Sequence, residues 1–275
     1  MGGPLPELPE VEAWRRAIDA WLVGRTLVDV QLLDPAVVRP RLSTRPADAW
    51  SEAGAWVRTL RGAKVRATAR AGKRLGVQVG DQWVLVHLGM TGRFVRGEEP
   101  RSARVCLTPD DGPPVWFADQ RRFGCWVPLA DRSALADGLG PDALGGGLDA
   151  TVLRDQLKGR SAVKVALLDQ ARLAGLGNIH AAEALWRSGI APTTRCAELT
   201  QGQLERLAPA IVAQLTEAVD DIGPVDDFVY VTEGGDNPFA VYGREGEPCP
   251  RCDTAVARVV QGGRSTFWCP RCQPA

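Results

Sequence analysis

Several kinds of residue and segment are scarce in this chain of 275 residues, and each shortage excludes a class of protein. There are two histidines, His87 and His180, so a metal site built on imidazole ligands is nearly excluded. No stretch approaches the roughly 18 apolar residues that a membrane-spanning helix needs. The first 25 residues hold four carboxylates and no apolar run, so we expect no signal peptide. The seven cysteines are an odd number, which disfavours a disulfide framework and favours a reducing, bacterial cytoplasm.

Net charge is also lacking, because 33 basic residues balance 33 acidic ones. The distribution along the chain is uneven, however. Residues 1–130 hold 19 basic and 14 acidic groups, residues 131–240 hold 9 and 16, and residues 241–275 hold 5 and 3. A local basic face is therefore possible near both ends of the chain, and such a face is what binds phosphate groups.

The apolar pattern divides the chain into three parts and predicts a multidomain α+β fold. Helical spacing over residues 10–23 is followed, up to about residue 129, by short strands separated by turn residues, which is typical of a β-sandwich. The expected strands are Val28–Leu33, Val65–Ala69, Leu75–Val79, Trp83–Leu88, Val105–Thr108, Val115–Ala118 and Cys125–Pro128. After a Gly-rich linker over 139–148, helices are expected over 151–157, 163–169, 179–188 and 203–220, followed by an irregular segment over 224–242. We predict domains over 1–138 (leading helix plus β-sandwich), 139–240 (helical) and 241–275 (metal-bound hairpin).

Four cysteines near the C-terminus form two CxxC turns, and we expect them to bind one structural zinc ion. The ligands are Cys249, Cys252, Cys269 and Cys272. Thiolate ligation of this kind selects zinc and closes the site to substrate. Strands over 256–260 and 265–268 are predicted between the two turns. Arg264, at the tip of this hairpin, is suited to a phosphate or a base edge, and it could equally be a solvated turn residue.

The N-terminal string PELPEVE, residues 6–12, is unusual. Pro9 and Glu10 are explained by a good helix start, but Pro6 and Glu7 are not. Further strings are GKRL at 72–75, HLGMTGRF at 87–94, DQRRFG at 119–124, LGPDAL at 139–144, GLGNIHAAEALW at 175–186 and VYGREGEPCPRC with QGGRSTFWCPRC at 241–272. Together and in this order they resemble the formamidopyrimidine-DNA glycosylase family (Fpg, or MutM), which shares its fold with endonuclease VIII.

This resemblance implies a base-excision repair glycosylase with abasic-site lyase activity, acting on damaged double-stranded DNA. It implies a helix–two-turn–helix DNA-binding domain over 139–240, with DNA in the cleft beside it. The implied nucleophile is the secondary amine of Pro6, and the implied acid/base is Glu7. Residues that the resemblance assigns to DNA are, for phosphates, Lys73, Asn178 and Arg264, and, for the space left by a flipped base, Met90, Arg121 and Phe123. Lys73 is also counted with the catalytic residues.

Two departures from the family pattern leave alternatives open. Met1 to Leu5 precede Pro6, and an acylated proline nitrogen has no nucleophilic lone pair. Three explanations compete: translation starts at the codon now read as Leu5, the extension is cut off, or the protein lacks lyase chemistry. In the last case it would be a monofunctional glycosylase or a lesion-binding homologue. A general zinc-ribbon nucleic-acid binder explains the last 30 residues alone.

The second departure concerns specificity. His180 stands where the family usually has Tyr, and residues 224–241 form a loop several residues shorter than the one that closes over 8-oxoguanine. A preference for 8-oxoguanine is therefore a hypothesis, and the sequence does not identify the damaged base. We expect the protein to bind DNA as a monomer.

Overall fold

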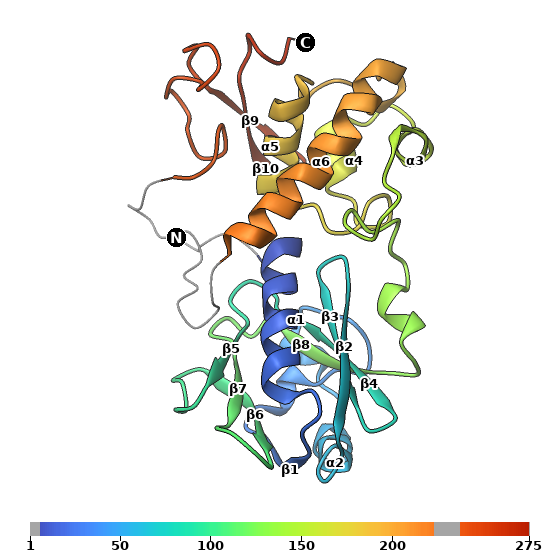
Figure 1. Cartoon of the computed structure of the whole chain (residues 1–275), viewed down its shortest axis with the longest axis vertical. Coiled ribbons are helices and arrows are strands. Elements are labelled where there is room, and N and C mark those ends of the chain that lie inside the picture. The colour runs from blue at the N-terminus through green and yellow to red at the C-terminus, as the bar shows by residue number, and fades with distance from the viewer. Residues whose placement is uncertain (1–5, 223–236, 275) are drawn as a thin grey trace. The chain divides into compact units, whose positions relative to one another are not determined.

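The computed structural model describes residues 6–222 and 237–274, and it divides into two units (Figure 1). The first unit takes in the described residues up to Asp137 together with Ile222, and the second those from Gly138 to Asp221 and from 237 to 274. In the part of the chain that is described, no helix is both long and apolar enough to cross a membrane.

The first unit begins with helix α1, Leu8–Leu22, which starts two residues earlier than the spacing predicts. Glu7 is its N-cap and forms a capping box with Glu10, in which the Glu7 backbone N–H donates to Glu10 Oε2 at 2.8 Å. Most apolar residues of α1 are buried, and the helix packs on strands β2 (Val65–Ala71) and β3 (Arg74–Val79) (Figure 1). The helix is followed by Gly24, whose φ of 89° is a left-handed conformation that glycine adopts without a steric penalty.

Two four-stranded antiparallel sheets make up the rest of this unit, in the orders β1-β6-β7-β5 and β2-β3-β4-β8. The strands are β1 (Leu27–Leu32), β2 (Val65–Ala71), β3 (Arg74–Val79), β4 (Gln82–His87), β5 (Arg93–Arg96), β6 (Ala103–Pro109), β7 (Val115–Ala118) and β8 (Cys125–Leu129). One apolar core joins residues of both sheets to α1, as in a sandwich. The predicted α+β class is confirmed, whereas β5 and helix α2 (Ala53–Thr59) were not predicted.

The Gly-rich stretch 139–148, which the sequence predicts as a linker, is partly packed by backbone hydrogen bonds. Gly140 N–H donates to Gln170 O, and Ala143 N–H donates to Ala174 O, both at 2.9 Å. A Cβ on Gly140 would lie 2.5 Å from Arg172 O, so glycine permits a close backbone approach here. This part of the stretch is therefore packed, and Ala143 is buried.

The second unit is helical, with a two-stranded hairpin at its end (Figure 1). Its elements are α3 (Ala150–Gln156), α4 (Val163–Leu167), α5 (Asn178–Ser188), α6 (Gln201–Asp221), β9 (Ala257–Gln261) and β10 (Arg264–Trp268). All four predicted helices and both predicted hairpin strands are present within one or two residues of the expected bounds. Most of the segment predicted as irregular, 224–242, lies outside the described residues.

Helices α5 and α6 form the largest helical contact of this unit. His180 lies buried between them, with Nδ1 3.3 Å from Gln214 Nε2 and its ring edge-on to Phe239. Position 180, where the family usually has Tyr, is thus filled by a buried His whose ring nitrogen meets the Gln214 amide of α6.

Candidate active site and metal centre

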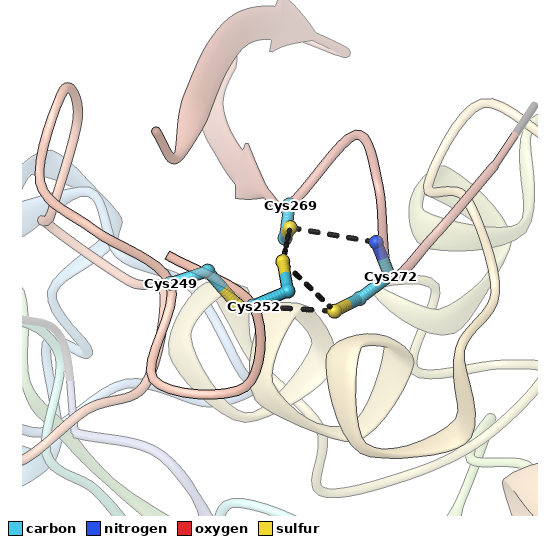
Figure 2. Close-up of side chains that lie close together, drawn as sticks. All are labelled: Cys249, Cys252, Cys269 and Cys272. Atoms are coloured by element: carbon cyan, nitrogen blue, oxygen red, sulfur yellow. Dashed lines mark hydrogen bonds between the residues drawn. The ribbon is translucent and has the colours of Figure 1, made fainter. Parts of the chain in front are cut away.

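Four cysteine sulfurs converge at the base of the β9–β10 hairpin (Figure 2). The Sγ atoms of Cys249, Cys252, Cys269 and Cys272 all lie within 4.8 Å of one another, with the closest pairs at 3.4, 3.5 and 3.9 Å. A tetrahedron with metal–sulfur bonds of about 2.3 Å puts its sulfurs about 3.8 Å apart, so the cluster fits zinc. With four thiolates the coordination is complete, and the zinc ion is structural.

The zinc centre is attached to helix α5 by two side chains. Trp186, on α5, donates its indole N–H to Cys249 Sγ at 3.4 Å. The guanidinium of Arg251, between the first two ligands, lies 3.8 Å from the Trp186 ring centroid and donates to the Trp186 carbonyl at 2.9 Å. That carbonyl is in the last turn of α5 and also accepts from Gly189 N–H at 3.2 Å, so Arg251 adds a side-chain donor to the C-terminal cap of the helix.

A buried lysine connects the opposite end of α5 to the zinc hairpin. Lys164 is fully buried, and its Nζ donates to Asn178 Oδ1 at 2.5 Å, to Thr266 Oγ1 at 2.9 Å and to Ser265 O at 3.2 Å. Asn178 Nδ2 also donates to Ser265 O at 3.0 Å. The structure therefore brings Asn178 and the residue next to Arg264 into direct contact, while Arg264 itself is exposed on the hairpin.

A buried carboxylate in the same helix holds the chain just beyond residues 223–236. Glu183 is 3% exposed and accepts hydrogen bonds from the backbone N–H groups of Ala240, Val241 and Tyr242 at 2.8–3.0 Å. Three donors on one carboxylate fix the direction in which this segment enters the finger. Neither Lys164 nor Glu183 was identified from the sequence. The position of Glu183 inside the GLGNIHAAEALW string was the available signal.

In the first unit, Pro6 and Glu7 lie buried at the start of α1. One turn further on, Glu12 Oε2 accepts from Arg70 Nε of strand β2 at 3.3 Å. Arg70 Nη1 in turn donates to Gly72 O at 3.0 Å, in the tight turn that presents Lys73 between β2 and β3. Burial alone would raise the pKa of Glu12, but hydrogen bonds and charges from Arg15, Arg16 and Arg70 lower it overall. The Lys73 turn is thus fastened to the helix that begins at Glu7.

Met90 and the pair Arg121 and Phe123 lie on two loops that pack backbone against backbone. A Cβ on Gly89, whose φ is 63°, would lie 2.5 Å from Gly124 N. Buried Asp119 also joins the loops, because it bonds to the Thr91 hydroxyl and accepts from Gly124 N–H at 2.7 Å. The structure therefore brings together the two loops that carry the three predicted gap-filling residues.

Between these loops and the Lys73 turn lies His87, which the sequence interpretation placed in a motif without assigning it a role. His87 Nδ1 accepts from Gly89 N–H at 3.1 Å. Burial, and then the charges of Arg74, Lys73 and Arg39, lower the pKa of His87 to about 4. His87 is therefore neutral at physiological pH and stabilises the turn that presents Met90.

The burial of His87 predicts that the free energy of unfolding depends on pH. The pKa of His87 falls from 6.5 to about 4 on folding, so the unfolded chain binds more protons between these values. The contribution of neutral His87 to the free energy of unfolding is fully present above pH 6.5. This contribution, about 3 kcal/mol, is lost as the pH falls toward 4. Urea titrations of the wild type and of His87→Asn over this range should show a shallower pH dependence in the variant. Equal slopes would contradict the assignment.

Comparison with known proteins places these features in context. Residues 5–126 match the formamidopyrimidine-DNA glycosylase N-terminal domain, 139–227 match the formamidopyrimidine-DNA glycosylase H2TH domain, and 246–275 match the zinc finger found in FPG and IleRS. The formamidopyrimidine-DNA glycosylase of Mycolicibacterium paratuberculosis is 37% identical, with 98% of this chain and 99% of that protein covered. That of Acidiphilium cryptum is 36% identical, with 98% and 100% covered.

Solved structures give the same result. MutM in complex with DNA containing carbocyclic 8-oxo-G has a TM-score of 0.83 at 28% identity, and the alignment covers 98% of this chain and 100% of that one. Lactococcus lactis Fpg in complex with DNA containing an abasic site has a TM-score of 0.84 at 26% identity, with the same coverage. The fold, the zinc finger and these relatives define a DNA glycosylase of base-excision repair. The chain belongs to the formamidopyrimidine-DNA glycosylase family.

Proposed function

We propose that this protein releases oxidised or ring-opened bases from duplex DNA and then cuts the strand at the abasic site through the amine of Pro6. The observation that carries the proposal is the position of Pro6 and Glu7, buried at the start of α1 in the unit that also presents Lys73 and the Met90 and Phe123 loops. Damaged DNA is the ligand in the titles of the related structures, including 8-oxo-G and abasic-site duplexes.

The proposed chemistry depends on the special properties of an N-terminal proline. Its secondary amine attacks C1′ as the damaged base leaves and gives up its N–H proton. The C1′–O4′ bond then breaks, O4′ leaves as the hydroxyl of the opened sugar, and the C1′–N bond becomes a cationic iminium that has no N–H proton to lose. That cation withdraws electrons, so the sugar loses a proton from C2′ and expels the 3′ phosphate; a second elimination expels the 5′ phosphate. Glu7 protonates the ring oxygen of the sugar and moves protons in the later steps. The capping box fixes the backbone of Glu7 at this position.

Other residues would bind and position the DNA. We assign phosphate contacts to Lys73 in the first unit and to Asn178 and Arg264 in the second. Asn178 opens helix α5 and therefore lies at the positive end of the helix dipole, which is a favourable place for an anion. Met90, Arg121 and Phe123 would fill the space left by the flipped nucleotide, since an exposed base gap is costly to leave empty. A guanidinium such as that of Arg121 can satisfy two acceptors of the orphaned base.

A second candidate function is lesion binding, or base release without strand cutting. The observation that favours it is the presence of five residues before Pro6 in the printed sequence, because an acylated proline nitrogen cannot form the iminium. In that case Glu7 would activate water instead. In either case we propose a monomer that acts on nucleoid DNA in the bacterial cytoplasm.

Borohydride trapping separates these functions. We expect covalent capture on duplexes with an abasic site, 8-oxoguanine or formamidopyrimidine, and less on thymine glycol, by a protein that begins at Pro6. The same short protein with an uncleaved Met before Pro6, verified by mass spectrometry, is the matched control and should not be captured. A third protein begins at Met1 and carries all five residues before Pro6. Capture of this long form would require another amine or a processing step. Capture of neither form would overturn the lyase proposal, and absence of base release from all of the lesions would overturn the glycosylase substrate class.

A further inference from the structure

Between Arg121 and Phe123 lies Arg122, whose φ of 61° is in the left-handed region. Residues other than glycine, asparagine and aspartate rarely adopt this backbone conformation, so the surrounding structure must hold Arg122 in it. The residues on either side are in contact, since the Arg121 guanidinium lies 5.0 Å from the centroid of the Phe123 ring. The turn at Arg122 thus directs both proposed gap-filling side chains to one side of the loop.

Two residues of the segment after β1 hold the two ends of Arg122. Asp34 accepts from Arg122 Nε and Nη2, both at 2.9 Å, in a bidentate ion pair. Arg39, which is fully buried, donates from Nη2 to the Arg122 carbonyl at 3.0 Å. One partner therefore fixes the side chain and the other fixes the peptide group, which is the arrangement that an unfavourable backbone conformation needs.

The same network anchors Asp34 and the neighbouring peptides. Arg104 Nη1 lies 3.4 Å from Asp34 Oδ2, and Arg104 Nε donates to the Asp119 carbonyl at 3.0 Å. The Arg121 N–H donates to Thr91 Oγ1 at 3.0 Å, which connects the turn to the Met90 loop. The loop from Asp119 to Gly124 is consequently held on both sides of Arg122 before any DNA is bound.

We infer that Asp34 and Arg39 are positioning residues for gap filling: they hold Arg122 in its left-handed conformation so that Arg121 and Phe123 are preset to enter the DNA. This inference rests on the proposed roles of Arg121 and Phe123. Neither Asp34 nor Arg39 touches the reacting atoms. Their contribution is to place the inserted groups in advance, so that the flipped state of the DNA forms without a prior rearrangement of the loop.

The test compares four proteins: wild type, Asp34→Asn, Arg122→Gly and the double variant. Asp34→Asn removes the charge that holds Arg122, and we expect single-turnover base release at saturating protein to slow about tenfold, with Kd for duplex DNA nearly unchanged. Glycine adopts a φ of 61° without help, so Arg122→Gly should stay within about threefold of wild type and should restore the double variant to that level. The matched control is Asp29→Asn. Asp29 lies on β1, and this substitution removes its exposed ion pair with Arg61, so the variant should behave as wild type.

Two further measurements keep the inference separate from the proposed function. In the protein without DNA, the Arg121 and Gly124 amides should exchange hydrogen faster in Asp34→Asn than in wild type or in Asp29→Asn. The fluorescence of 2-aminopurine placed opposite a stable abasic analogue should show that Asp34→Asn inserts Arg121 and Phe123 into the DNA more slowly than wild type does. Unchanged exchange and unchanged rates in Asp34→Asn would overturn the inference. So would an Arg122→Gly protein as slow as Asp34→Asn, because Arg122 would then act on DNA directly. A wild type that releases no damaged base would instead count against the proposed function, since the exchange experiment needs no substrate.

Discussion

Removal of zinc is expected to unfold residues 249–272 and to weaken binding to damaged duplex DNA on the order of 100-fold, because each lost charge-assisted hydrogen bond is worth about 1.5–3 kcal/mol. The finger has little apolar material of its own: four of the ten residues in its hydrophobic cluster are the cysteine ligands. Structural zinc supplies about 10–16 kcal/mol of folding free energy in small fingers. Arg264 and the Ser265 carbonyl that meets Asn178 depend on this hairpin.

Hydrogen exchange and binding to an abasic-analogue duplex, before and after treatment with a strong chelator and after zinc is restored, would measure this effect. Cys252→Ser should reproduce the chelated state, and Cys196→Ser, a buried cysteine away from the cluster, should retain one zinc per chain. Full affinity in a protein shown to be free of zinc would contradict the prediction.

Substitution of Lys164 by methionine is expected to lower the free energy of unfolding by about 3 kcal/mol, since the side chain is buried and donates charge-assisted hydrogen bonds to three oxygens. Methionine fills a similar volume but leaves Asn178 Oδ1 and Thr266 Oγ1 without this donor. Asn178 would keep the hydrogen bonds of its Nδ2 to Ser265 O and the Tyr242 hydroxyl but lose the one that holds its Oδ1, so its orientation would be less fixed, and affinity for duplex DNA should fall about tenfold.

Lys158→Met is the matched control, because Lys158 is exposed and its ion pair with Asp155 is at the surface. Such a pair contributes at most about 1 kcal/mol. Urea denaturation and duplex binding of the two variants give the comparison. If Lys164→Met were as stable as Lys158→Met and bound DNA equally well, the network at the start of α5 would have no energetic role.

Much of the fold follows from patterns that are local in sequence. The period of 3.6 residues predicted α1 and the four helices of the second unit, and the two CxxC turns predicted the zinc site. Strand β5 was not predicted because its two apolar residues, Phe94 and Val95, are adjacent and flanked by arginines, so that no alternation appears, and α2 was not predicted because Gly54 in its first turn disfavours a helix. The domain bounds 1–138, 139–240 and 241–275 stay predictions, as do the roles of the site residues.

The buried charged residues were beyond the reach of the sequence because their partners are distant along the chain. Lys164 meets Thr266 across 102 residues, and Arg39 meets the Arg122 carbonyl across 83. A lysine or an arginine in isolation is expected to be solvated, and nothing next to either residue indicates otherwise. The family motifs supplied the residues that face outward, whereas the residues that hold them in place came from the three-dimensional contacts.

The close approach of Gly89 to the Gly124 backbone has a consequence for chimeric proteins. With 2.5 Å between a Cβ at Gly89 and Gly124 N, neither loop has room to change its course alone. Segments 87–92 and 119–124 therefore behave as a single exchangeable module, although 26 residues of strand and turn separate them. Recombination between relatives, or the grafting of a different lesion preference, must transfer both segments together. The transferred pair must also keep the hydrogen bonds of Asp119 to the Thr91 hydroxyl and to Gly124 N–H.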